Sequence, residues 1–367
     1  MIYHINGIFN AFLVLGFLSS LVSAYDGRFD RFFPAWSTEL SQYRDNCTLD
    51  RDAYYSQPAS AGGWGLINCM LIHTSEYVKV EMSVVSILFG LLPSTLFLFG
   101  PMQDEIALLA LRRPVLATLL GISIPSLRLS DSTSPDLESR LNHSVNLTFR
   151  PWKLPVPPLW LMAIVSAFEY ILAGLAVANT VYQAYQLAFW SIAMSSMAIS
   201  SGPIPKTYGP FLWVFLTISV YIVNFGAFNL KYKENYKRQK NWRGNWSRLF
   251  WNEVTPCMYG EPMWLIRKRE TYCQMMLSSL VNGGVVVLLL YSTVLLSSQI
   301  FISLGDAVPV LARYLAASVV CRGIMDFELR GMRETRSDTK SCHDQVPLTS
   351  SEIGCVTDAQ SCADLAY

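Results

Sequence analysis

The strongest constraint on this chain is a set of uncharged apolar runs, each close to the length that crosses a bilayer. A membrane-spanning helix needs about 20 mainly apolar residues, and a backbone inside lipid has to satisfy its own hydrogen bonds. Only 15% of the 367 residues are charged. Four segments meet the length, and they predict an all-α, polytopic membrane helix bundle: 82–99, 159–178, 211–230 and 274–297.

A fifth apolar stretch, 300–324, is less uniform because it contains Asp306, Pro309, Arg313 and Arg322. It is either a fifth span or a helix at the interface. We favour a crossing, since a cluster of arginines follows it closely, as at cytosolic span ends. The transmembrane region then covers 82–330 with four or five spans, and the polar tail 331–367 is expected to be disordered.

Two other apolar segments could raise the span count. The segment 105–124 carries two adjacent arginines at its centre, and each costs about 2.5–3.5 kcal/mol at the middle of a bilayer. We therefore expect a cytosolic helix lying against the membrane. The segment 182–201 is uncharged but rich in Gln, Ser and Tyr, and we expect a lumenal continuation of the second span near the surface. Were both to cross, glycan on Asn142 or Asn146 would show it.

The N-terminus resembles a secretory signal. An apolar run at 8–21 precedes Val22-Ser23-Ala24, small residues in the arrangement that signal peptidase cleaves. We predict a signal peptide over 1–24, followed by a polar cap at 25–81. An uncleaved signal anchor is the alternative, because no Lys or Arg precedes the apolar run.

The charge of one loop gives the orientation independently. The loop at 231–273 holds many more basic than acidic residues, so the positive-inside rule makes it cytosolic. Counting back through three spans makes the loop at 101–157 cytosolic and places 25–81 in the lumen or outside the cell. A signal peptide requires the same placement.

The predicted cap contains groups suited to an oxidising compartment. Asn46-Cys47-Thr48 is a glycosylation sequon, and Cys47 and Cys69 are free to pair where disulfides form. We hypothesise a Cys47–Cys69 disulfide and a glycan on Asn46. Two unpaired cysteines in a small cap are the alternative.

Polar residues inside the spans are the candidate functional groups. Glu169 lies in the second span, and an intramembrane carboxylate is a functional hypothesis by default. It could bind a proton, a cation or a basic partner such as Arg313. Asn224 and Asn282 also lie within spans. The alternative for all three residues is helix packing through hydrogen bonds.

The basic loop has an aromatic pattern of its own. Trp242 and Trp246 are four residues apart, with Arg243 and Arg248 close by. Aromatic and basic side chains at helical spacing suit a helix on an anionic lipid surface. The pattern predicts contact with lipid head groups, and a solvated basic loop is the alternative.

No motif points to a reaction. We find no phosphate-binding loop, dinucleotide fingerprint or nucleophile elbow, and we predict no catalytic, cofactor or metal residue. A net charge of +1 gives no reason to expect nucleic acid. The first functional reading is a non-enzymatic scaffold or partner-binding protein. The second is a transporter or channel using Glu169, Asn224 and Asn282, and the third is a lipid-acting enzyme using Asp104 or Glu105.

Short motifs are spread along most of the chain: Trp64-Gly65-Leu66-Ile67-Asn68-Cys69, Glu76-Tyr77-Val78-Lys79, Gly100-Pro101, Arg112-Arg113-Pro114 and Phe168-Glu169-Tyr170. Together they resemble a group of uncharacterised multi-pass membrane proteins of filamentous fungi. The resemblance implies a lumenal cap, a few spans and a cytosolic basic loop. The group has no assigned activity, so the resemblance implies no site residue.

Overall fold

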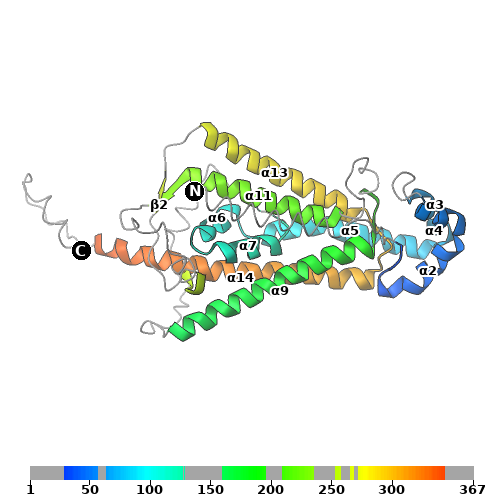
Figure 1. The fold of residues 1–367 in the computed structure, drawn as a ribbon, viewed down its shortest axis with the longest axis horizontal. Helices are drawn as coiled ribbons and strands as arrows, with labels where there is room; N and C mark the ends of the chain where they lie inside the picture. Colours follow the sequence, from blue (N-terminus) through cyan, green and yellow to red (C-terminus); the bar gives the residue numbers. More distant parts are fainter. Residues whose placement is uncertain are drawn as a thin grey trace, which may run out of the picture.

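The protein is an elongated helix bundle with a small helical cap at one end (Figure 1). The computed structural model describes residues 29–56, 63–126, 128, 159–195, 209–234, 253–257, 265–267 and 272–343, without the side chains of 159, 232–234, 265–267 and 330–343. In chain order, the elements are η1 (Pro34–Trp36), α2 (Ser37–Asn46), α3 (Thr48–Ser56), α4 (Trp64–His73), α5 (Glu76–Phe99), α6 (Gln103–Arg112), α7 (Pro114–Ser123), α9 (Leu159–Phe189), β1 (Ile192–Ala193), α11 (Gly209–Lys231), β2 (Tyr232–Glu234), β3 (Leu265–Arg267), α13 (Tyr272–Ser297), β4 (Gln299–Ile300) and α14 (Leu304–His343).

Five helices of the described chain are long and apolar enough to cross a membrane: α5, α9, α11, α13 and α14. This confirms the four predicted spans and the preference for a fifth, and with them the all-α polytopic fold. Most of each apolar window faces outward rather than into the bundle. Such an outer surface suits lipid, because polar backbone groups are already bonded within the helices.

The ends of α5 follow from local sequence. Ser75 caps the helix, its hydroxyl oxygen accepting a hydrogen bond from the Val78 N–H, and Glu76 places negative charge at the positive end of the helix dipole. At the other end, the Gly100 N–H donates to the Leu96 carbonyl oxygen. A Cβ at Gly100 would lie 2.9 Å from that oxygen, so the position requires glycine.

The second span is longer than its predicted core. Helix α9 continues to Phe189, as the predicted continuation requires, and this part is packed into the bundle. Gln183 and Ala184 are fully buried, and Leu187 nearly so. Beyond the helix, β1 pairs with β4 and ties the end of α9 to the end of α13.

The segment predicted as one helix against the membrane is instead two short helices inside the bundle, so that prediction is wrong. Helices α6 and α7 form a hairpin that packs against α9, α11 and α14. The chain after α7 comes back to the last turns of α5, where the hairpin began: the Ser126 hydroxyl donates to the carbonyl oxygen of Pro93 in α5. It therefore adds no crossing and leaves the alternation of the spans unchanged.

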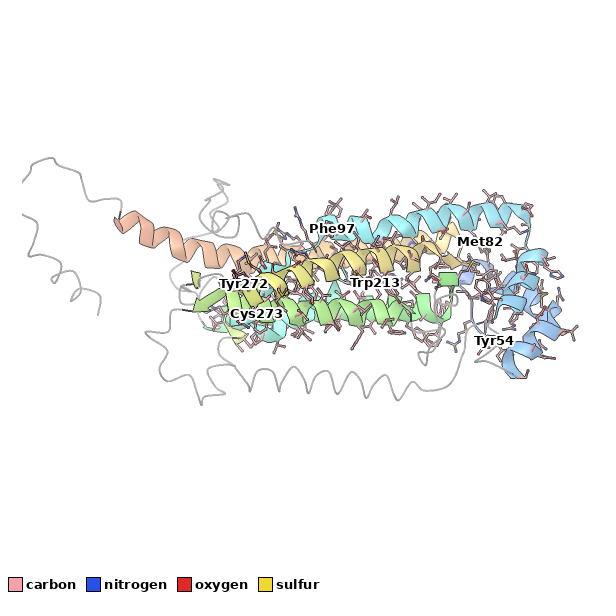
Figure 2. The ribbon with its side chains drawn as sticks, turned by 90° about the horizontal axis from the view of Figure 1, so that it is seen from above. Tyr54, Met82, Phe97, Trp213, Tyr272 and Cys273 are labelled. Carbon is pink, nitrogen blue, oxygen red and sulfur yellow. A yellow bond between two sulfur atoms is a disulfide. The ribbon has the colours of Figure 1, made fainter. Side chains whose placement is uncertain are left out.

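Three apolar cores follow one another along the long axis. The first lies in the cap, the second between α5, α11, α13 and the start of α14, and the third around the α6–α7 hairpin and the later part of α14. Figure 2 shows Tyr54 in the cap, Trp213 within the bundle, and Cys273 at the opposite end. We call these two ends the cap end and the far end.

Cap helices α2, α3 and α4 are joined by the predicted disulfide. Cys47 and Cys69 are bonded, with their Cα atoms 6.1 Å apart. Asn46 is the exposed last residue of α2, so a glycan there would meet solvent. The aromatic rings of Phe29 and Tyr54 pack edge to face beneath these helices.

The predicted disordered tail begins later than expected. Helix α14 runs on to His343 and projects past the other helices (Figure 1), so the prediction is wrong for 331–343. The predicted signal peptide and the rest of the tail lie outside the described residues. At the base of the basic loop, β2 and β3 pair in antiparallel fashion.

Candidate functional site

The candidate site forms around Arg113, at the break between α6 and α7. Pro114 occupies the first turn of α7, where a backbone N–H would have no partner within the helix. Its ring disfavours helical φ and ψ angles at the preceding residue, Arg113. Arg113 accordingly has φ −126° and ψ 73°. The break turns its side chain into the bundle, where it is 0% exposed.

The guanidinium of Arg113 lies between two carboxyl groups from different spans. Its Nη1 is 2.5 Å from Glu169 Oε2 on α9 and 2.5 Å from Glu328 Oε1 on α14. Its Nη2 donates to the Ser166 hydroxyl at 2.6 Å. Glu169 and Glu328 are both buried. One positive charge therefore faces two carboxyl groups in a place removed from bulk solvent.

An aromatic ring completes this group. The guanidinium carbon of Arg113 is 5.3 Å from the ring centroid of Tyr170, within the range of a cation–π contact. The Tyr170 hydroxyl donates to a carboxylate oxygen of Glu253. We call Arg113, Ser166, Glu169, Tyr170 and Glu328 the charge cluster.

A short piece of the loop between α11 and α13 is docked on the charge cluster. The second carboxylate oxygen of Glu253 accepts from the N–H of Val115, at the start of α7, where a negative charge is favoured. The carbonyl oxygen of Glu253 accepts from Ser166, and the Cys257 N–H donates to Glu328 at 3.0 Å. Residues 253–257 therefore close the far end of the cluster.

The thiol of Cys257 is sealed in by this docking. It is 0% exposed, and burial, with the negative charge of Glu328 adding to it, raises the pKa of the thiol well above its usual range. Because the thiolate is the reactive form, the docked thiol should resist alkylation.

A second ionic group lies closer to the middle of the bundle. Glu105, buried at the start of α6, is 2.7 Å from Arg322 of α14 and also accepts from the Met102 N–H. Arg322 reaches Asp326 as well. The hypothesis of a lipid-acting enzyme used Asp104 or Glu105, but the carboxylate of Glu105 is held in these contacts.

The structure changes the role expected of Glu169. Its ionic partner is Arg113, not Arg313 as suggested from sequence, and Glu328 supplies a second acid that the predicted fifth span ended too early to include. Among the described residues, no hydrogen bond joins Glu169 to Asn224, which is buried, or to Asn282, which is half-buried. The three predicted polar residues therefore do not form one site.

The two charged members of the cluster that were missed, Arg113 and Glu328, had a signal in the sequence. The Arg112-Arg113-Pro114 motif marked a helix break inside an apolar segment. In the sequence the motif predicts exclusion from the bilayer, because the cost of a buried arginine is visible there and the opposite charges on distant helices are not. Glu328 lies four residues beyond the predicted span; extending the helix by one turn would have found it.

Other buried side chains have polar atoms with no hydrogen-bond partner in the described part of the chain. Leaving such an atom unpaired costs about 1–3 kcal/mol, and several together approach the whole stability of a domain, about 5–15 kcal/mol. We call the following group, taken from four helices, the polar column: Gln103 of α6, Gln183 of α9, Trp213 of α11, and Tyr314 and Ser318 of α14.

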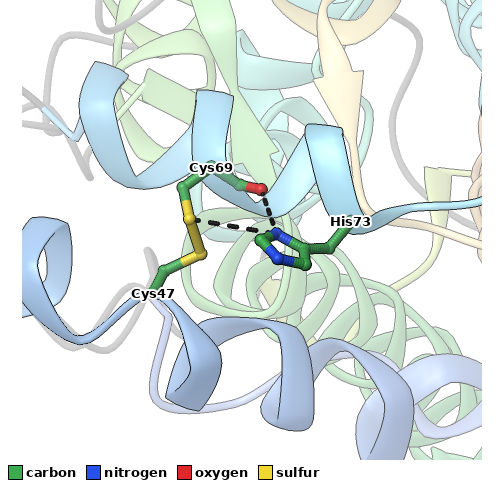
Figure 3. A group of neighbouring side chains, drawn as sticks. All are labelled: Cys47, Cys69 and His73. Carbon is green, nitrogen blue, oxygen red and sulfur yellow. Dashed lines mark hydrogen bonds between the residues drawn. A yellow bond between two sulfur atoms is a disulfide. The ribbon is translucent and has the colours of Figure 1, made fainter.

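The cap holds a group of metal-ligand residue types, but it is occupied by the disulfide. The ligand atoms of Cys47, Cys69 and His73 lie within 4.8 Å of one another (Figure 3). The two sulfurs are bonded to each other, and His73 Nδ1 is 2.9 Å from the Cys69 carbonyl oxygen. In this oxidised form the sulfurs are not thiolates, which are the form that binds metals.

The residues predicted to touch lipid head groups, Trp242, Arg243, Trp246 and Arg248, lie outside the described residues, so that interpretation stays a prediction. A comparison with known proteins finds no matching family model, no matching curated protein and no matching solved structure.

Proposed function

We propose that this integral membrane protein moves protons or another small monovalent cation across the bilayer, with the charge cluster as the site that binds the cation. One observation supports this most directly: a single guanidinium is buried between two carboxyl groups contributed by two different spans. Ionisable groups in membrane helices are costly, and they commonly mark ion pathways and proton relays.

The charges of the cluster do not balance. With both carboxyl groups ionised, Arg113, Glu169 and Glu328 carry a net charge of −1, so uptake of one proton or monovalent cation would neutralise them. Glu169 also has an unsatisfied hydrogen-bond acceptor, because its Oε1 is buried and has no hydrogen-bond partner in the described structure.

The second candidate function is that of a non-enzymatic scaffold or partner-binding protein, which stays a prediction. It was motivated by the sparse polar content of the predicted spans, and the buried ionic groups weaken that motive. One observation still favours it: the cluster joins α7, α9, α14 and residues 253–257, and such a junction could serve only to hold these parts together.

Flux through reconstituted vesicles separates the two candidates. Purified protein is placed in vesicles, and separate runs impose gradients of protons, Na⁺ or K⁺, each followed by an entrapped dye that is selective for that ion. We expect one of these to decay faster than in empty vesicles, and Glu169→Gln to slow that decay at least about tenfold, which corresponds to about 1.4 kcal/mol.

The control is Glu76→Gln, an acid in α5 whose side chain is 88% exposed. It should leave flux unchanged. Each variant is first checked for an unaltered unfolding midpoint in detergent. If wild-type vesicles leak no faster than empty ones under all three gradients, the transport proposal fails and the scaffold candidate is preferred.

We also propose that the protein resides in the secretory pathway or plasma membrane with its cap lumenal or extracellular. The Cys47–Cys69 disulfide supports this, since disulfides persist in oxidising compartments. Glycosidase treatment should increase the electrophoretic mobility of the wild-type protein but not that of the Asn46→Gln variant. A glycan on Asn245, in the basic loop, would contradict the orientation. Membership of the fungal group described above is retained as a proposal.

A further inference from the structure

The members of the polar column lie on or beside α14, between the cap end and the charge cluster. Trp213 lies near the start of α11, and its ring centroid is 6.0 Å from that of Tyr314. Ser318 follows Tyr314 by one turn of α14, and Glu328 returns to the same helical face farther along. The inner face of α14 therefore connects the column to the cluster.

The other two members lie beside this face. Gln183 donates to Asn179, which in turn donates to the carbonyl oxygen of Arg313, the neighbour of Tyr314. Gln103 lies two residues before Glu105, whose carboxylate binds Arg322, one turn beyond Ser318. Polar groups thus lie along α14 at Arg313, Ser318 and Arg322, between the levels of Trp213 and Glu328.

All five members are buried completely or almost so, with 0–1% of the residue exposed. Each has at least one polar atom that no described protein group satisfies, and both amide atoms of Gln103 are in this state. Buried polar groups in folded proteins bond to protein or to ordered water. Helices from four parts of the chain supply these atoms, so the feature is not an accident of one helix face.

We propose that the polar column binds a file of internal water molecules and that this file carries protons between the cap end and the charge cluster. This inference rests on the proposed transport function and names its substrate class as the proton. Hydroxyl groups suit the task because each can donate one hydrogen bond and accept another. The proton that enters at one end is released at the other, with no net chemical change.

The first test asks whether the column is wet. Intact protein in detergent is irradiated so that water molecules, including any bound inside the protein, are split into hydroxyl radicals. These radicals oxidise the side chains next to them, and the oxidised positions are mapped by mass spectrometry. We expect Trp213 and Tyr314 to be oxidised at least about tenfold faster than Met70. Met70 is an equally buried and readily oxidised side chain in the apolar core of the cap. Equal protection of all three would overturn the proposal.

The second test measures proton flux in dye-loaded vesicles. Tyr314→Phe removes only the hydroxyl group, and Ser318→Ala does the same one turn away. We expect each to slow proton flux about tenfold or more. The matched controls are Tyr272→Phe and Ser83→Ala, at exposed positions, and both should leave flux unchanged.

The outcomes separate the two proposals. Proton flux that requires Glu169 but is unaffected by Tyr314→Phe and Ser318→Ala overturns the column and leaves the transport function intact. Flux of Na⁺ or K⁺ without proton flux also overturns the column alone. Absence of any flux overturns both. The unfolding midpoint of each variant is measured as well, so that a loss of flux caused by unfolding is recognised.

Discussion

At the cap end the protein is held together by apolar packing and a disulfide, whereas at the far end it is held by buried charge. The cap core consists of aromatic and aliphatic side chains with Cys47–Cys69 across it. The far end joins its helices through Arg113, Glu169 and Glu328, none of which is more than 6% exposed.

The difference follows from the surroundings of each end. The cap is small and lies beyond the spans, where a few short helices bury too little apolar surface to be stable alone, so a covalent link is useful. The far end lies among membrane helices, where helix association lacks the hydrophobic driving force that water provides. Directed polar contacts can hold helices there, at the cost of desolvating the groups that make them.

The largest effect should come from removing the shared cation. Arg113→Met leaves two buried carboxyl groups without their partner, and breaking a buried pair in this way costs about 3–5 kcal/mol. We expect a much lower unfolding midpoint in detergent. Adding Glu169→Gln and Glu328→Gln to the same chain should recover much of the loss, because no unpaired charge is left.

The control for that experiment is Lys79→Met. Lys79 forms an ion pair with Glu76 at the cap end, with side chains 35% and 88% exposed. An exposed pair contributes at most about 1 kcal/mol, so the midpoint should change little. Equal losses for Lys79→Met and Arg113→Met would contradict the contrast between the two ends.

The next effect should come from the disulfide. The bond joins residues 22 positions apart, and closing a loop of that length stabilises by about 3 kcal/mol on the chain-entropy estimate. Cys47→Ser with Cys69→Ser should therefore loosen the cap. Hydrogen exchange should increase in α2–α4 and stay unchanged around Glu328. Faster exchange throughout α14 would show that the two ends are not independent.

A smaller effect is expected where residues 253–257 dock. Tyr170→Phe keeps the ring beneath Arg113 but removes the hydrogen bond to the Glu253 carboxylate. A hydrogen bond to a charged group is worth about 1.5–3 kcal/mol, so alkylation of Cys257 should become about 10- to 100-fold faster.

The chain contains its own references for this labelling. Cys273 is exposed and should react at once in both proteins, whereas Cys321 is buried in the bundle and should react in neither. Mass spectrometry separates the three sites. An unchanged rate at Cys257, with both references behaving as stated, would show that the Tyr170 hydroxyl does not hold the segment down.

The smallest effect should be a pH dependence at the cap surface. The hydrogen bond from Arg44, reinforced by the positive charges of Arg44 and Arg51, lowers the pKa of Asp45 from its ordinary value of 3.8. A carboxyl group whose pKa is lowered on folding stabilises the protein above the unfolded value, and this contribution is lost as the pH falls through the folded value. Asp45→Asn should therefore lower the unfolding midpoint slightly at pH 6, and the difference should vanish as the pH drops below 3.8.

Sequence reasoning recovered the spans because apolar length is a local property. The helices around Glu169, Asn224 and Asn282 were expected close to where they form, and the Cys47–Cys69 disulfide was a hypothesis based on an oxidising compartment. The partners of Glu169 were not recovered, since Arg113 and Glu328 are 56 and 159 positions away along the chain. Nothing local distinguishes a shared buried arginine from one that lies on the membrane surface.

By itself the sequence determined that this chain crosses a membrane as helices and where those helices run, because transfer of apolar side chains from water depends on composition and length alone. Tertiary structure decided which charges are buried. A lone arginine in an apolar segment is costly, and that cost is offset only when carboxyl groups from other helices arrive within hydrogen-bonding distance. The α6–α7 hairpin therefore lies inside the bundle because Arg113 meets Glu169 and Glu328 there.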